Sequence, residues 1–164
     1  MMHLIATFGG IGTLRPAPGT WGSLAALPCA WVLMVLGGPW LLVAATLVIL
    51  PLGYFAALEE ILATRDTDPS WVVIDEVAGQ WIALWPVAFG AAMMNAAPSA
   101  LWPGWVAGFA LFRLFDIAKP GWVGRADRRG DALGLMLDDV IAGVFAALGV
   151  IVLAGLAHGA MRLL

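Results

Sequence analysis

Charged residues and cysteine are both scarce in this sequence, and each shortage narrows the classes of protein it can belong to. Of its 164 residues, 12% are charged and 62% are hydrophobic, whereas a soluble domain is roughly half apolar and a quarter charged. The single cysteine, Cys29, lies in an apolar run, so neither a disulfide framework nor a cysteine zinc site is available. The composition therefore predicts an integral membrane protein with a single domain over residues 1–164.

Several familiar function classes are excluded because their motifs are missing. The net charge of −3 and the lack of a basic aromatic patch exclude a nucleic-acid partner. The chain has no Asp-x-Asp-x-Thr motif of aspartyl phosphatases, no Ser-Gly-His or paired-histidine pattern of membrane acid phosphatases, and no Walker loop. The N-terminus lacks a basic region followed by a short apolar core and a cleavage site, so we expect no removable signal peptide.

The apolar residues fall into five segments, separated by glycine, proline and polar residues. Residues 1–20 are rich in glycine and proline, which favours a loop over a regular helix. The first expected span begins within 18–23 and ends near 36. The other four cover about 40–58, 71–94, 104–117 and 133–157. The first and fourth are short, since crossing the hydrocarbon takes about 20 residues. We therefore predict an all-α polytopic membrane helix bundle of about five spans with a Gly/Pro-rich N-terminal loop, and no obligate protein partner.

Basic residues occur in every second link between the spans, and this pattern predicts how the chain is oriented in the membrane. The links at 37–39 and 95–103 carry no charge, whereas the N-terminal segment and the other two links hold Arg15, Arg65, Lys119, Arg125, Arg128 and Arg129. Because cytoplasmic loops are enriched in lysine and arginine, we expect these segments to face the cytoplasm. Arg162 alone is then expected at the outer end.

Acidic residues occur inside the predicted spans at matching depths. Asp138 and Asp139 lie about one helical turn inside the last span, and Asp75 and Glu76 lie roughly 6–8 Å inside the third. Asp116 lies near the inner end of the fourth span. Acids at helix starts also interact well with the helix dipole, but intramembrane acids usually mark a functional site. We therefore expect the five acids to meet in one shallow cavity that faces the cytoplasm.

These side chains suit chemistry on a phosphate. Clustered carboxylates without histidine or cysteine suit a hard cation, with Mg²⁺ the leading choice. Arg113 and Lys119, three residues to either side of Asp116, are candidate phosphate ligands, although Arg113 could instead reach the headgroups or pair with Asp116. Thr20 or Ser23 could cap the first long helix, whose free N–H groups would bind another phosphate oxygen. The sequence predicts a metal-dependent site for a phospholipid phosphate.

At these residues the sequence resembles the phosphatidylglycerophosphatase A family. The matching blocks, in the family's order, are Gly10-x-Gly12, Pro18-Gly-Thr-x-Gly-Ser23, Asp75-Glu76-x-x-Gly79-x-Trp81-Ile82, Phe112-Arg113-x-x-Asp116-x-x-Lys119-Pro120, Asp127-Arg128 and Gly134-x-Met136-x-Asp138-Asp139-x-x-Ala142-Gly143. The blocks spread over most of the chain, which makes the match specific. Arg15 and Gly121-Trp122 depart from the prolines expected near those positions.

The resemblance implies Mg²⁺-dependent removal of the terminal phosphate of phosphatidylglycerophosphate, which gives phosphatidylglycerol at the cytoplasmic face of the bacterial inner membrane. We expect Asp75, Glu76, Asp138 and Asp139 to hold the metal together with Asp116. Either a metal-activated water or an aspartate could attack the phosphorus. Two other functions remain open: a metal-dependent enzyme like the CDP-alcohol phosphatidyltransferases, whose Asp-Gly…Ala-Arg pattern we do not find, and a non-enzymatic cation transporter.

Overall fold

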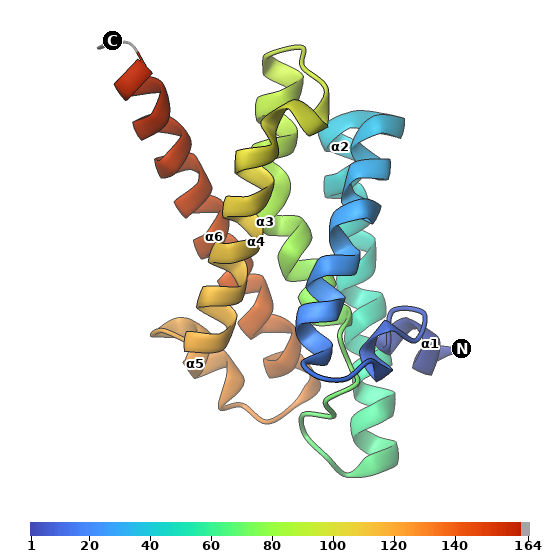
Figure 1. Cartoon of the computed structure of the whole chain (residues 1–164). Helices are drawn as coiled ribbons and strands as arrows, with labels where there is room; N and C mark the ends of the chain where they lie inside the picture. The colour runs from blue at the N-terminus through green and yellow to red at the C-terminus, as the bar shows by residue number, and fades with distance from the viewer. Residues whose placement is uncertain (162–164) are drawn as a thin grey trace.

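The chain folds into helices, and the computed structural model describes residues 1–161, so Arg162 lies outside the described residues. Over this range the structure contains no strand. The elements are α1 (Met2–Ala6), η1 (Ile11–Thr13), α2 (Pro18–Thr64), α3 (Ile74–Met93), η2 (Pro98–Leu101), α4 (Trp102–Ala118), α5 (Trp122–Asp127) and α6 (Ala132–Met161) (Figure 1). The predicted all-α class is confirmed.

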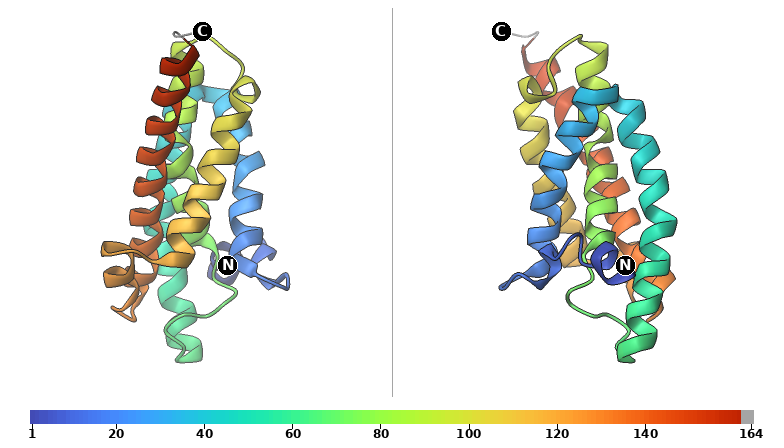
Figure 2. Two further views of the ribbon diagram at one scale, coloured as in Figure 1. Left: turned by 60° about the vertical axis from the view of Figure 1, so that its left-hand side comes forward. Right: turned by 90° about the vertical axis from the view of Figure 1, so that its right-hand side faces the viewer.

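Helix α2 consists of two limbs that run in opposite directions (Figure 2). The reversal occurs where the backbone leaves the helical region, at Gly37 and at Gly38, which has a φ of 67°. This conformation is easy for glycine and strained for other residues. The predicted break after the first apolar segment is therefore confirmed. The second limb extends beyond the expected span of about 40–58, because the helix continues to Thr64 and ends at Arg65 in the left-handed region.

Helix α3 lies at the centre of the bundle, with the limbs of α2 on one side and α6 on the other (Figure 1). Most of its residues are buried, and Trp81 donates a hydrogen bond of 3.0 Å to the carbonyl oxygen of Ala26 in the first limb of α2. A polar side chain on α3 therefore faces other helices rather than the surroundings. This position explains how one helix can carry Asp75, Glu76 and Gln80 near its start.

The charged links gather at one end of the bundle (Figure 2). α1, α5 and the link at 65–73 lie there, whereas the reversal in α2, η2 and the last turns of α6 lie at the opposite end (Figure 2). The prediction that residues 1–20 form only a loop is wrong for residues 2–6. They precede the first glycine and form α1, which packs against α2, and whose Met2, Ile5 and Ala6 belong to a buried apolar cluster.

Within residues 1–161, three helical segments are long and apolar enough to cross a membrane: Pro18–Thr64, Pro98–Ala118 and Ala132–Ala160. The structure therefore supports membrane-spanning helices, but it does not confirm the predicted number of about five spans. α3 is absent from this set, and its polar residues lie within its first two turns. Because α3 is central and neighbouring helices cover it, its polar side chains are not exposed to the surroundings of the bundle.

Candidate active site

A cavity of about 210 Å³ lies at the charged end of the bundle. Six of the nine predicted site residues line it: Asp75, Glu76, Asp116, Lys119, Asp138 and Asp139. They come from α3, from α4 and the residue after it, and from α6, which are far apart in the sequence. The remaining lining residues include Asp68, Asp127 and Asp131 from the links at this end. The predicted meeting of the five acids in one cavity is therefore observed.

Two glycines allow α3 and α6 to approach closely enough for their acids to meet. A Cβ on Gly79 would lie 2.6 Å from the main-chain oxygen of Asp139, and a Cβ on Gly143 would lie 3.1 Å from the Cα of Gly79. Real Cβ atoms essentially never approach another atom as closely as 2.6 Å, and a Cβ on Gly143 would lie closer still to the main-chain oxygen of Gly79. The two backbones are therefore in direct contact beside the acids, as small residues at a helix interface allow.

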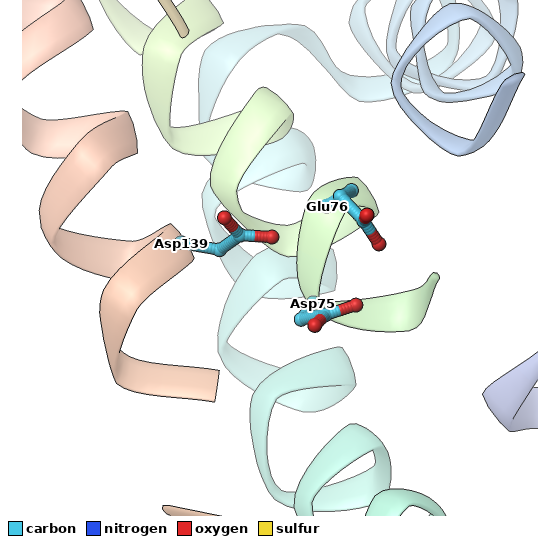
Figure 3. Close-up of side chains that lie close together, drawn as sticks. All are labelled: Asp75, Glu76 and Asp139. Atoms are coloured by element: carbon cyan, nitrogen blue, oxygen red, sulfur yellow. The ribbon is translucent and has the colours of Figure 1, made fainter. Parts of the chain in front are cut away.

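The acids form two overlapping groups. In one, oxygen atoms of Asp75, Glu76 and Asp139 lie within 4.8 Å of one another. Figure 3 shows Asp139 extending from α6 toward the two acids of α3. The second group meets the same distance limit and consists of Asp116, Asp138 and Asp139. Asp139, only 2% exposed, belongs to both groups and is the geometric link between them.

The first group contains oxygens that lack a partner in the part of the chain the structure describes. They are Asp75 Oδ1, Glu76 Oε2 and Asp139 Oδ1, and each is buried. A buried charge without a partner is very costly, whereas coordination to a metal compensates it. Carboxylate oxygens are the ligands that Mg²⁺ and Ca²⁺ prefer. The donor set and its missing partners therefore fit a hard divalent cation.

Lys119 connects the cavity to the link that follows α4. Its Nζ lies 2.8 Å from Asp138 Oδ2 and also bonds Asp127. Partial burial alone would lower the pKa of Lys119, but the hydrogen bonds to Asp127 and Asp138 raise this pKa well above its usual value. The ammonium group therefore stays charged at any working pH. It supplies a fixed positive charge at the wall of the cavity.

Arg113 lies beside the cavity rather than in its wall. Its Nη1 lies 2.7 Å from Asp116 Oδ2, on the next turn of α4. This is the pairing with Asp116 considered above as an alternative role for Arg113. The two arrangements coexist, since Asp116 also belongs to the second acid group.

The start of α2 packs against this arginine, but not in the predicted way. Ala17, and not Thr20 or Ser23, is the N-cap of α2, and no side chain of the described residues caps it. The Ser23 hydroxyl instead donates to the Gly19 carbonyl oxygen at 2.9 Å and accepts from Arg113 at 3.3 Å. The capping prediction is therefore wrong, because Ser23 lies a full turn inside the helix, where a hydroxyl bonds the preceding turn. Thr20 does not line the cavity.

Sequence reasoning missed two polar residues near the site. Gln80 is fully buried, and neither atom of its amide has a partner among residues 1–161. It lies four residues after Glu76 and therefore on the same face of α3, one turn deeper. Asp127 pairs with Lys119. Gln80 could have been found from the sequence, because a glutamine within an apolar segment is unusual. The pairing of Asp127 could not, because it depends on how the link after α4 folds.

The fold and the cavity together define a class of protein: a helical bundle with apolar helices and a buried carboxylate site suited to a divalent cation. The family model described as Phosphatidylglycerophosphatase A matches residues 4–154. The chain belongs to the phosphatidylglycerophosphatase A family and is a lipid phosphatase. The resemblance inferred from the sequence blocks is confirmed.

Three curated relatives match most of the chain. Phosphatidylglycerophosphatase A of Haemophilus influenzae is 34% identical over 148 residues, with 90% of this chain and 85% of the relative covered. Phosphatidylglycerophosphatase A of Escherichia coli is 34% identical over 147 residues, covering 88% and 78% respectively. A protein of Bacteroides thetaiotaomicron named putative phosphatidylinositol-3-phosphatase is 35% identical, covering 87% and 86%. No solved structure matches the chain.

Proposed function

We propose that this protein is a Mg²⁺-dependent phosphatidylglycerophosphatase, which hydrolyses the terminal phosphate of phosphatidylglycerophosphate to give phosphatidylglycerol and inorganic phosphate. The observation that carries the proposal is the set of buried oxygens on Asp75, Glu76 and Asp139 that have no hydrogen-bond partner in the described part of the chain. They lie in a cavity that also contains the Lys119 ammonium group. A divalent cation and an anionic phosphate are together the ligands that such a site fits.

The roles of the residues follow from their positions. Asp75, Glu76 and Asp139 would hold the cation, with Asp116 and Asp138 beside them. A divalent cation in such a site supplies Lewis acidity toward a phosphoryl oxygen. Lys119 faces the cavity and would bind the phosphate of the substrate as a point charge. Arg113, fixed by Asp116 and Ser23, would add a second positive charge next to the site.

The substrate phosphate would reach the cavity from the headgroup layer of the cytoplasmic leaflet of the bacterial inner membrane. The site lies at the end of the bundle where the basic links gather, and basic links favour the cytoplasm. In this arrangement the two limbs of α2, together with α3, α4 and α6, cross the bilayer as five passes. The lipid tails would remain among the apolar side chains of the bundle surface.

The shape of the interior favours an enzyme over a cation transporter. A transporter needs polar groups along the whole path, but the acidic cavity is confined to one end. A second cavity of about 540 Å³ at the opposite end is lined almost wholly by apolar side chains of α3, α4 and α6. The Bacteroides relative is named for an inositol lipid, so the headgroup that this site prefers has to be determined by experiment.

Phosphate release from lipids in detergent tests the proposal. The full chain should release inorganic phosphate from phosphatidylglycerophosphate with Mg²⁺ and lose this activity in EDTA. Asp139→Asn should abolish turnover while retaining the helical circular dichroism and elution profile of the wild type. A panel containing phosphatidylinositol 3-phosphate and phosphatidic acid ranks the headgroups. Activity that survives EDTA, or turnover only when a CDP-lipid is present, would contradict the proposal.

A further inference from the structure

We propose that the cavity binds two divalent cations and that Asp139 bridges them. This inference rests on the proposed function, in which a cation binds these acids, and it specifies how many ions bind and which residue they share. The geometric basis is that the two acid groups, each within 4.8 Å, overlap at Asp139 and at no other residue. A carboxylate has two oxygens and can ligate two ions.

The two groups differ in how their oxygens are occupied, and this difference assigns the tighter site. Asp75 Oδ1, Glu76 Oε2 and Asp139 Oδ1 are buried, and no hydrogen-bond partner for them exists in the described range 1–161. In the second group, by contrast, Asp116 Oδ2 pairs with Arg113 and Asp138 Oδ2 pairs with Lys119. An ion at the first group therefore compensates oxygens that otherwise lack partners, whereas an ion at the second competes with two cationic side chains. The first group holds the tight ion and the second the weaker one.

The charge of the site also favours two ions. Carboxylate ligands bind metal in the deprotonated form, and the five acids together with Asp127, which shares Lys119, then face only Arg113 and Lys119, so these groups carry four negative units. One divalent ion leaves the cluster negative, and a phosphate monoester would be repelled. Two ions neutralise these groups and therefore remove the repulsion of the phosphate. At short range in a protein, such like charges repel strongly because the effective dielectric constant is well below that of water.

A polar side chain outside the two groups supports a ligand at this place. Gln80 is fully buried one turn beyond Glu76 on the same face of α3, and its amide has no partner among the described side chains or backbone. Buried amides almost always have a partner. Gln80 does not itself line the cavity, so a water bound one turn deeper than Glu76 is the partner that this amide lacks.

Binding of Mn²⁺ to the purified full chain in detergent tests the inference. The wild type should bind two Mn²⁺ per chain, one tightly and one weakly, and electron paramagnetic resonance should show an exchange-coupled pair at saturation. Asp138→Asn should retain the tight ion and lose the coupling. Asp75→Asn should lose the tight ion. Asp139→Asn should weaken both sites by at least about tenfold, since each loses a charged ligand.

The outcomes separate this inference from the proposed function. A single uncoupled Mn²⁺ in the wild type, together with normal phosphate release, would overturn the bridging role of Asp139 and leave the phosphatase intact. Loss of only one of two ions in Asp139→Asn would overturn it as well. If Asp139→Asn fails to fold, Asp116→Asn provides the second test. It leaves the first acid group unchanged, so it must keep one tight, uncoupled ion, and a coupled pair in that variant would count against the second site.

Discussion

A Cβ on Gly79 would lie 2.6 Å from the main-chain oxygen of Asp139, so α3 and α6 touch where their acids face each other. The neighbouring atoms at Gly79 include backbone, which cannot rotate away as a flexible side chain can. The meeting of the acids therefore depends on the absence of a Cβ methyl group at both Gly79 and Gly143. Packing and chemistry are coupled at this point.

Gly79→Ala is expected to separate α3 from α6 and to impair the site. Overpacking typically costs about 1–3 kcal/mol, so the melting temperature in detergent should fall, and phosphate release should fall with it. Gly155→Ala is the matched control, because Gly155 lies in the exposed last part of α6 with nothing within 4 Å of its added Cβ. That variant should melt at or slightly above the wild-type temperature. Equal melting temperatures for the two variants would contradict the close contact.

Much of the site was predictable from the sequence because its chemistry has few alternatives inside an apolar bundle. Asp75-Glu76 and Asp138-Asp139 are costly wherever they are unpaired, so two such pairs near the same ends of two helices had to meet each other or a cation. Gly37-Gly38 predicted the reversal in α2 because few other residues adopt that backbone. These inferences depend on local properties of the chain.

The other features of the site depend on three-dimensional contacts that no local sequence pattern predicts. Ser23 looked like a helix cap, but α2 starts at Pro18, so the hydroxyl lies within the helix and bonds the Gly19 carbonyl oxygen and Arg113 instead. The sequence likewise did not show which acids Lys119 contacts. In the structure its ammonium group forms ion pairs with both Asp127 and Asp138. Side-chain pairing between links is decided by tertiary packing.

Lys119→Met is expected to weaken the interaction with the substrate phosphate. A hydrogen bond to a charged group contributes about 1.5–3 kcal/mol, so kcat/KM should fall by about 10- to 100-fold, with the loss expressed mainly in KM. The long apolar stem of methionine retains much of the packing. Arg129→Met is the control, since Arg129 forms an exposed ion pair with Asp131 and does not line the cavity. An unchanged KM in Lys119→Met would show that Lys119 only forms ion pairs with Asp127 and Asp138 and does not bind the substrate phosphate.

Gln80→Met distinguishes a structural glutamine from one that contacts the site's ligands. Both amide atoms of Gln80 are buried without a partner in the described chain, and replacing such an amide by an apolar group of similar shape relieves a desolvation penalty of about 1–3 kcal/mol. The metal-free variant should therefore melt at the same or a higher temperature than the wild type. Because the partner of the amide is expected to be a bound ligand, Mg²⁺-dependent phosphate release should fall. A variant that is stable and fully active would remove Gln80 from the site.

Asp131 gives a pH-dependent contribution to stability that can be isolated by substitution. Hydrogen bonding to Arg129 and to the backbone N–H of Gly134 holds the pKa of Asp131 below its ordinary value. A carboxyl whose pKa is depressed by folding stabilises the folded state above its unfolded pKa, about 3.9, and loses this effect as pH falls through the lower folded value. Asp131→Asn keeps an acceptor for Gly134 but removes the charge. The wild type should melt at a higher temperature than this variant near neutral pH, and the difference should shrink below about pH 4. Thermal melts of both proteins between neutral and acidic pH measure it, and a difference that stays constant over that range would show that the charge of Asp131 does not stabilise the start of α6.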